Sequence, residues 1–363
     1  MNKKHRIKRI LKLLPGLLLA GALLTPAAAL AADDPAIAHS GEWEGLELAP
    51  GIKLGVLTEV EATYEKTGDE ETSDIAVSAL EIGLSADPAE GIHAEAVLYW
   101  EQDEDVEFDV AFVSLGGTEK IPVRLDAGWL YAPFGRFESL MLSDPLTLEL
   151  GETREAAAGL AYVLGPVELW AGAFNGQLDR EDDTIDNGVA ALTVTPCEGL
   201  QFGASFSSDI GEGSGYLDDL NDLLAVGGDV DRTPAVSAWL RWDIAKFSLS
   251  AEYLGAVDDL KWTTPAGEEG EGGETVSQNP QAWFIDAGYA FTDEWSAALR
   301  YEGSSEFKPE EWPEARYGGA VVWQFHPLAS IGAEYLYGTF EDSEDEDAPD
   351  DSHLVTLKLA LEF

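Results

Sequence analysis

The feature that most constrains this chain is an alternation of apolar and polar residues with a period of two, repeated along nearly its whole length. In the final segment Val355, Leu357, Leu359, Leu361 and Phe363 share one face of an expected strand. About sixteen such segments occur, which makes the expected fold class all-β. They begin near residues 52, 75, 92, 106, 122, 154, 167, 187, 200, 234, 246, 281, 295, 314, 329 and 354.

The two faces of these segments differ in chemistry, and the links between them differ in length. In the first segment Leu54, Val56 and Val60 share one face, and the other face carries charged residues such as Glu59 and Glu61. This pattern suits lipid outside and water inside, although a soluble β-sandwich produces it locally as well. Links after even-numbered strands are short, whereas most links after odd-numbered strands are long. That regularity is typical of a closed antiparallel transmembrane β-barrel with short periplasmic turns and long external loops.

Aromatic residues provide a second indication of a membrane barrel, because rings gather at both expected ends of the strands, as in the interfacial girdles of such barrels. The expected external set is Tyr64, Trp100, Trp129, Tyr131, Phe206, Tyr253, Tyr301 and Tyr337. The expected periplasmic set is Tyr162, Phe202, Trp242, Phe247, Tyr289, Phe291, Trp295, Trp323, Phe325 and Phe363.

The amino terminus predicts export. A cationic start, an apolar run from Leu13 to Leu24 and the small residues around Ala29 and Ala31 indicate a signal peptide over residues 1–31. The apolar run is shorter than the ~20 residues that a transmembrane anchor needs. We expect residues 32–50 to form a periplasmic lead-in and residues 51–363 to form the barrel.

The net charge is strongly negative, with 21 Lys and Arg against 69 Asp and Glu, or −48 in total. The signal peptide carries six of the basic residues and no acidic ones, so the mature chain has 15 basic and 69 acidic residues and a net charge of −54. A nucleic-acid partner is excluded because phosphate binding needs a basic surface. We expect most of the acidic residues to lie in the external loops, where they form a hydrated surface or bind divalent cations at the lipopolysaccharide surface.

The third expected external loop, near 132–153, is apolar, unlike the other long loops. Folding it inward against the barrel wall would bury this apolar surface and narrow the pore. The alternative is an external extension of the two flanking strands. Sixteen strands leave room for an aqueous channel. The chain is too short for a 22-stranded transporter with a folded plug.

The same region carries a family resemblance. The run from Pro133 to Arg154, with Ser143-Asp144-Pro145-Leu146-Thr147 and Glu149-Leu150-Gly151-Glu152-Thr153-Arg154, resembles the LbtU-type siderophore porin family. The stretch from Gly55 to Ala62 does so too. The resemblance implies a bacterial outer-membrane porin without a plug domain. It also implies passive or facilitated entry of small solutes, ferric siderophores in particular. A general diffusion porin without siderophore preference is the alternative.

Charged residues at inward positions suggest a mechanism of selection. Basic and acidic groups on opposite sides of a constriction create a transverse field that selects polar solutes by charge and size. The alternative is that each base pairs with a lumen carboxylate for structural reasons. The candidate constriction residues on the third loop are Arg136, Glu138, Asp144, Glu149 and Glu152. The candidate pore-wall charges are Lys53, Arg124, Asp126, Arg241, Arg300, Glu302, Arg316 and Lys358.

A barrel enzyme is the competing class, and we expect no catalytic site. The mature chain has few histidines, and a rim site at Ser352 and His353 is weaker than a solvated turn as an interpretation. No metal site and no cofactor is expected, because zinc-type spacings and phosphate-binding glycine loops do not occur. The expected partners are a small-molecule solute, with a ferric siderophore as the family-based candidate, and outer-membrane lipid with lipopolysaccharide. Monomer and homotrimer both remain open.

Overall fold

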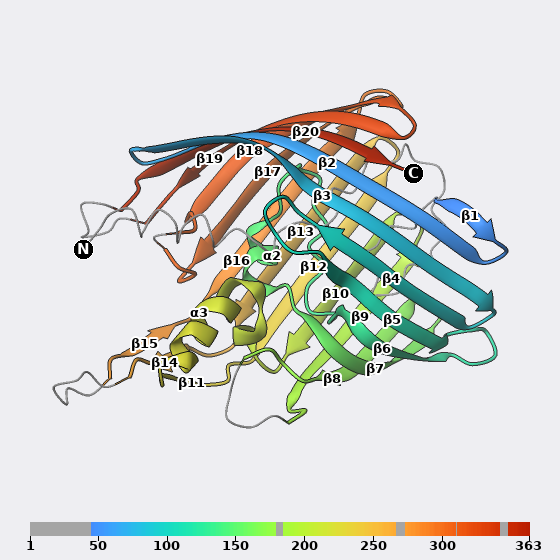
Figure 1. Ribbon diagram of the computed structural model, residues 1–363, viewed down its shortest axis with the longest axis horizontal. Helices are drawn as coiled ribbons and strands as arrows, with labels where there is room; N and C mark the ends of the chain where they lie inside the picture. Colours follow the sequence, from blue (N-terminus) through green and yellow to red (C-terminus); the bar gives the residue numbers. More distant parts are fainter. Residues whose placement is uncertain (1–44, 179–183, 266–272, 310, 342–347) are drawn as a thin grey trace.

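The structure, a computed structural model, describes residues 45–363 except 179–183, 266–272, 310 and 342–347. The predicted signal peptide and residues 32–44 of the predicted lead-in lie outside the described residues. Sixteen antiparallel strands form a closed ring (Figure 1). In chain order they are β2 (Ile52–Thr67), β3 (Glu70–Ala89), β4 (Ile92–Trp100), β5 (Glu107–Gly116), β6 (Val123–Tyr131), β7 (Arg154–Leu164), β8 (Val167–Phe174), β9 (Asn187–Cys197), β10 (Leu200–Ser207), β12 (Ala235–Ile244), β13 (Phe247–Ala256), β16 (Gln281–Ala290), β17 (Trp295–Ser305), β18 (Ala315–His326), β19 (Ala329–Thr339) and β20 (Asp351–Glu362).

Pairing between the first and last barrel strands closes the ring. Val60 of β2 lies opposite Leu359 of β20, and the backbones of Val56 and Phe363 exchange two hydrogen bonds of 2.8 and 3.0 Å. The sixteen strands expected from the alternation are confirmed, and most begin within one residue of the expected position. The predicted start of the second barrel strand was wrong. β3 begins at Glu70, not near 75, so the first external link consists only of residues 68–69. Polar residues at the start of β3 hid this pairing with the end of β2.

The outward face of the ring is apolar and exposed, as a lipid-facing surface must be. On β20, Val355, Leu357 and Leu359 are exposed and alternate with buried Thr356 and Lys358. Exposed rings surround the short-turn end, among them Phe202, Trp242, Phe247, Trp295, Trp323 and Phe363. Others surround the opposite end, among them Tyr64, Phe206, Tyr253, Tyr301, Tyr317 and Tyr335.

One predicted girdle residue, Tyr131, was wrong. It is buried, and its hydroxyl donates a 2.5 Å hydrogen bond to Asp109 Oδ1. The strand β6 ends there, and the chain turns into the barrel, so the outward-inward alternation stops applying at this residue.

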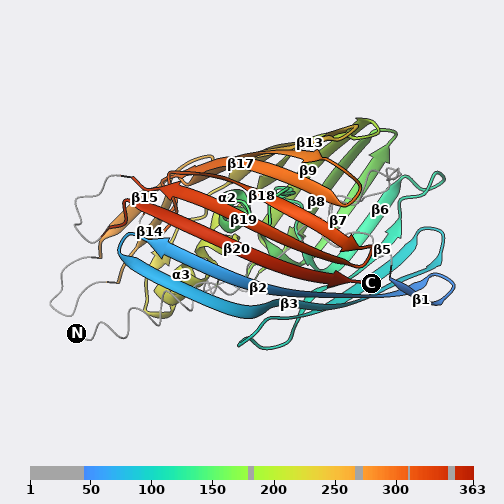
Figure 2. The same ribbon diagram turned by 90° about the horizontal axis from the view of Figure 1, so that it is seen from above.

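Further elements lie mostly at the end of the barrel opposite the C-terminus (Figure 2). The long link between β10 and β12 holds the short helix η1 (Ile210–Glu212) and α3 (Ser214–Ala225). In the sequence, the spacing of Leu217, Leu220, Leu223 and Leu224 predicts a short helix in this link, and α3 confirms it. A small sheet is formed by β11 (Asp229–Val230), β14 (Leu260–Thr263) and β15 (Thr275–Gln278). At the short-turn end, the close of the predicted lead-in forms β1 (Leu46–Ala49), which pairs with β2. No helix in the described part of the chain has the length and apolarity to cross a bilayer.

Candidate functional site

The link between β6 and β7, residues 132–153, runs inside the barrel (Figure 1). It contains the short helix α2 (Leu146–Gly151), all of whose residues are buried. Apolar residues of this inward loop, including Phe134, Leu146 and Leu150, are almost completely buried. The wall makes room for it: a Cβ on Gly332 of β19 would lie 2.7 Å from a methyl carbon of Leu142. A larger residue at this wall position would therefore force the Leu142 side chain to shift.

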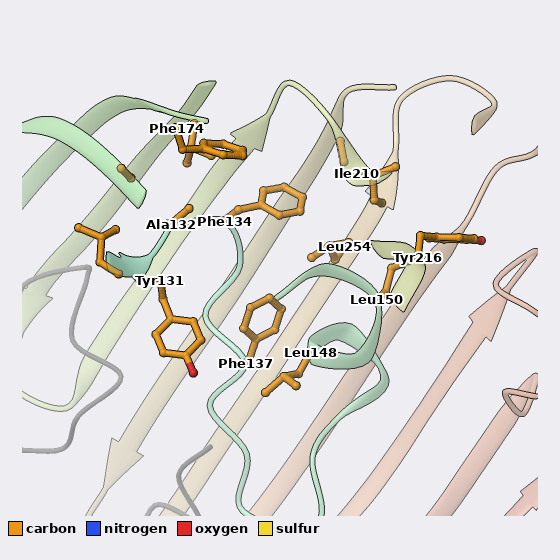
Figure 3. Close-up of a cluster of buried hydrophobic side chains, with 14 of the residues drawn as sticks. Tyr131, Ala132, Phe134, Phe137, Leu148, Leu150, Phe174, Ile210, Tyr216 and Leu254 are labelled. Atoms are coloured by element: carbon orange, nitrogen blue, oxygen red, sulfur yellow. The ribbon is translucent and has the colours of Figure 1, made fainter. Parts of the chain in front are cut away.

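The apolar side of the inward loop belongs to a larger core inside the barrel (Figure 3). Leu148 and Leu150 of α2 join this core, as do Tyr216 of α3 and Leu254 of β13. Phe307, in the link between β17 and β18, stacks on Trp312 with ring centroids 5.7 Å apart. This core ties the loop to the external helix α3. One side of the barrel interior is therefore filled with packed side chains.

Wall carboxylates hold the backbone of the inward loop from the other direction. Glu252 of β13 accepts hydrogen bonds from the backbone N–H groups of Arg136 (2.9 Å) and Phe137 (2.8 Å). Asp286 of β16 accepts from the N–H of Leu140 at 2.9 Å. Hydrogen bonds to ionised acceptors are about twice as strong as neutral ones, so these contacts fix the entry half of the loop.

Two further wall carboxylates hold the second half of the loop. Glu334 of β19 accepts from the N–H of Leu142 at 2.7 Å and from the Ser143 hydroxyl at 2.5 Å. Glu302 of β17 accepts from the N–H of Leu146, at the start of α2, at 2.9 Å. We call Glu252, Asp286, Glu302 and Glu334 the clamp carboxylates. Along the loop the contacts come in the order Glu252, Asp286, Glu334 and Glu302. This is the chain order of the four carboxylates except that Glu334 of β19 comes before Glu302 of β17.

Three of the predicted wall cations bind the same loop through its carbonyl oxygens. Arg300 donates to the carbonyl oxygens of Ser143 and Asp144, each at 3.0 Å. Arg316 donates to the Asp144 carbonyl at 3.1 Å, and Lys358 donates to the Leu142 carbonyl at 3.1 Å. The three cations thus converge on one short stretch of loop backbone.

Each of these cations is also paired with a wall carboxylate. Arg300 Nε lies 2.8 Å from Asp286 Oδ1, and both side chains are 0% exposed. Arg316 Nε lies 2.6 Å from Glu302 Oε1. Lys358 Nζ lies 3.1 Å from Glu59 Oε2 and 2.8 Å from Glu61 Oε1. The geometry therefore matches the structural pairing that sequence reasoning held as the alternative to a wall of free positive charge.

The other predicted wall charges lie away from the inward loop. Arg124 pairs with Asp126, Nε to Oδ1 at 2.9 Å, and with Glu168 at 2.9 Å. Arg241 pairs with Asp243 at 2.8 Å. Lys53 is exposed near the start of β2. They do not join Arg300, Arg316 and Lys358, because their strands or their heights along the barrel differ.

The predicted loop acids have different surroundings. Glu138 pairs with Arg136 inside the loop at 2.6 Å. Burial raises the pKa of Asp144 to about 7, against the opposing charges of Lys358 and Arg300. Burial together with the charge of Asp144 raises the pKa of Glu149 well above its usual range, while Arg316 opposes the shift. Asp144 and Glu149 of the loop therefore interact electrostatically with cations of the wall.

Glu152 has different charged neighbours from the other loop acids. Burial and the charge of Asp109 raise the pKa of Glu152 well above its usual range. Arg154 opposes that shift. Glu152 thus lies toward β5 and β7 and not toward the three cations.

Sequence reasoning missed Glu252, Asp286 and Glu334. The signal was present, because each alternates with an exposed apolar or aromatic neighbour, namely Tyr253, Ile285 and Tyr335. Among the described residues the buried inward carboxylates outnumber the buried inward bases.

A different stretch of the inner wall faces no loop backbone. We call Glu81 of β3, Glu95 of β4 and Asp109 of β5 the acidic wall. The charged neighbours that act most strongly on Glu81 are Asp109, Glu59 and Glu362, all carboxylates. Among the described residues Glu81 has no ion pair with a base. In this part of the structure Glu81 therefore lacks a compensating base among the described residues, whereas Asp109 pairs with Arg154 at 3.2 Å.

The ring of sixteen strands, its apolar exterior and its inward loop define the class as a porin-type barrel, and solved structures share this fold. The outer membrane channel DcaP of Acinetobacter baumannii superimposes with a TM-score of 0.60 and 12% identity over 88% of this chain and 99% of that one. OmpF of Salmonella typhi, in a complex with daunomycin, gives 0.59 and 12% over 88% and 100%. Fold and apolar exterior together place the barrel in an outer membrane.

Relatives in sequence are UPF0422 proteins. Those of Legionella pneumophila strains Lens and Paris are 24% and 25% identical over 311 and 313 residues, which is 76% of this chain in both cases. The chain spans 57% of the length of these relatives. A UPF0422 protein of Coxiella burnetii is 40% identical over 52 residues, 14% of this chain and 11% of that protein. No protein-family model matches the chain.

Proposed function

We propose that this chain is an outer-membrane channel through which small solutes enter by passive or facilitated diffusion. The observation that carries the proposal is the division of the lumen into two sides. The wall from β13 to β19 is bound to the fixed inward loop, and the inner face of β3, β4 and β5 carries the carboxylates Glu81, Glu95 and Asp109. A barrel with a narrowed, water-lined passage supports diffusion selected by size and charge.

The solute class is a finer part of the proposal. Ferric siderophores are supported by the resemblance of the inward loop and the first strand to the LbtU-type siderophore porins. A general diffusion porin is the second candidate. It is favoured because Arg300 and Lys358 donate to wall carboxylates and to groups of the inward loop, and Arg316 is paired with Glu302, so none of the three cations lacks a negative partner.

A barrel enzyme has weaker support. At the rim where sequence reasoning placed a conceivable site, His353 bonds the Tyr335 hydroxyl at 2.8 Å, with Asp351 at 4.0 Å. Neither contact activates Ser352 as a nucleophile.

Liposome swelling tests the channel and its solute together. Liposomes that contain the purified protein should swell in neutral sugars at rates that fall with sugar size, and protein-free liposomes should not. Siderophore-selective entry would support the family-based solute. Equal entry of sugars and a ferric siderophore of matched size would support general diffusion, and an absence of swelling with every solute would contradict the channel.

A further inference from the structure

A second hollow in the lumen lies at the short-turn end, away from the inward loop. It has a volume of about 350 Å³ and is formed by the β3–β4 turn, the end of β5 and the inner faces of β4 and β6. The side chains that matter for its chemistry are Asp87, His93, Glu95, Phe112, Arg124 and Asp126. We call it the periplasmic cavity. Its volume is within the range of small-molecule sites.

On one side of the cavity, the charge of Arg124 is balanced by two carboxylates. Arg124 donates to both oxygens of Asp126, at 2.9 and 3.1 Å, and to both oxygens of Glu168, at 2.9 and 3.3 Å. Asp126 also accepts from the Ser114 hydroxyl at 2.6 Å and from Trp170 Nε1 at 3.1 Å. Arg124 and Asp126 thus neutralise and satisfy each other, and an anion entering the cavity finds no free cationic partner in Arg124.

On the other side of the cavity, Glu95 has a carboxylate oxygen without a hydrogen-bond partner among the described residues. The Glu95 side chain is 6% exposed, and its Oε2 lies 3.4 Å from His93 Nε2. Its Oε1 is buried and has no hydrogen-bond partner among the described residues. His93 Nδ1 lies 2.9 Å from Asp87 Oδ1, so the imidazole is held between two carboxylates. Buried polar atoms in native proteins almost always have a partner, so Oε1 calls for a donor from outside the chain.

The remaining lining decides the class of donor. Phe112 packs near His93 with ring centroids 5.8 Å apart and supplies an apolar side chain to the cavity. An apolar surface beside an unpaired carboxylate suits an aliphatic or aromatic stem with a positively charged head. No group of three or more metal-ligating side chains occurs within the described residues, which disfavours a metal ion as the occupant.

We propose that the periplasmic cavity is a binding subsite for small organic cations that carry N–H donors, primary ammonium solutes above all, and that the Glu95 carboxylate binds their charged head. The subsite rests on the channel function proposed above and names the solute class that the channel favours. The acidic wall of Glu81, Glu95 and Asp109 leads to it, since Glu95 belongs to both. A cation on this side of the lumen therefore meets Glu81, which has no ion pair with a base among the described residues, and then the cavity at Glu95.

Planar-bilayer recordings of the purified full chain test the subsite, with n-butylammonium as the probe. In sodium chloride, n-butylammonium chloride should lower the sodium conductance in a saturable way. Tetramethylammonium, which has the charge but no N–H donor, should act much more weakly, and butyrate should have no saturable effect. In Glu95→Gln the butylammonium concentration for half effect should rise by about tenfold, the loss expected when a charged hydrogen bond becomes neutral.

Glu198→Gln is the matched control, because it removes the same charge from an exposed residue in the β9–β10 turn, at the same end of the barrel but outside the cavity. It should respond like the native chain. An equal response of the native chain to tetramethylammonium and butylammonium would overturn the subsite without any variant. So would an unchanged response of Glu95→Gln. Absence of conductance in the native chain would instead overturn the proposed channel, so the two failures are distinguishable.

Discussion

Two sectors of the same inner wall carry inward charges with opposite fates. On β13, β16, β17 and β19 the clamp carboxylates face the inward loop, and Asp286 and Arg300 are paired with no exposure to solvent. On β3, β4 and β5 the acidic wall has no hydrogen bond from the loop backbone among the described contacts, and Glu81 has carboxylates as its charged neighbours. The difference shows that contact with the loop decides what a wall charge does. Asp286 beneath the loop is paired with a base and holds the loop backbone, whereas Glu81 has no ion pair with a base among the described residues.

The largest expected effect follows from removing a carboxylate on the loop side. Asp286→Ala leaves the Arg300 guanidinium buried without its closest carboxylate, and the Leu140 N–H loses its acceptor. Removing one partner of a buried ion pair costs roughly 3–5 kcal/mol. The free energy of unfolding in detergent, followed by tryptophan fluorescence against urea, should fall by that amount.

The matched control is Glu81→Ala on the acidic wall, which removes a carboxylate with no ion pair to a base among the described residues. Its unfolding free energy should fall far less than that of Asp286→Ala, because the substitution leaves no buried base unpaired. Equal losses in the two variants would remove the distinction between the sectors.

A smaller effect is expected when the loop is loosened without leaving a buried cation. Glu334→Gln retains the shape of the side chain but weakens its bonds to Leu142 and Ser143. A hydrogen bond to a charged group contributes about 1.5–3 kcal/mol. Single-channel current should become noisier and larger on average, and Glu81→Gln should leave the noise unchanged. Quiet, native-like current in Glu334→Gln would mean that the carboxylate does not hold the loop.

Selectivity should shift when the loop side is made to resemble the acidic wall. Arg316→Ala removes the partner 2.6 Å from Glu302 and the donor to the Asp144 carbonyl. The lumen then gains unpaired negative charge, so the reversal potential in a salt gradient should move toward cation selectivity. Lys66→Ala, which removes a cation at the outer end of β2, is the control. A shift toward anions would contradict the assignment of Arg316 to the ion pair.

The smallest effect concerns pH. Burial raises the pKa of Glu149 in the folded chain, so its ionisation costs stability at any pH above its ordinary value of 4.5, and the cost grows as pH rises toward the folded-state pKa. Glu149→Gln avoids this cost. The variant should be more stable than the native chain at pH 8, and the gain should disappear near pH 4 in urea unfolding. A gain that is independent of pH would show that the carboxyl does not titrate in this way.

The local pattern predicts much of this molecule. The alternation of Val355, Leu357 and Leu359 with polar residues depends only on the two-sided geometry of a strand. The number of strands and the outward-facing side of each could therefore be predicted from the sequence. The leucine spacing of α3 was equally local. The wrong predictions lie at strand ends. Tyr131 is the last residue of β6, where the chain turns into the barrel, and Glu70 begins β3, where polar residues still pair with β2.

Alternation and link length are properties of neighbouring residues, so they predict a sixteen-stranded barrel with lipid outside. The pairing of Arg300 with Asp286, the contact of Lys358 with Glu59 and the hold of four carboxylates on one loop become visible only in the folded barrel. These groups lie on different strands, most of them far apart along the chain. Lys358 and Glu59 meet only when the ring closes, and the register of that closure is set by all sixteen strands together.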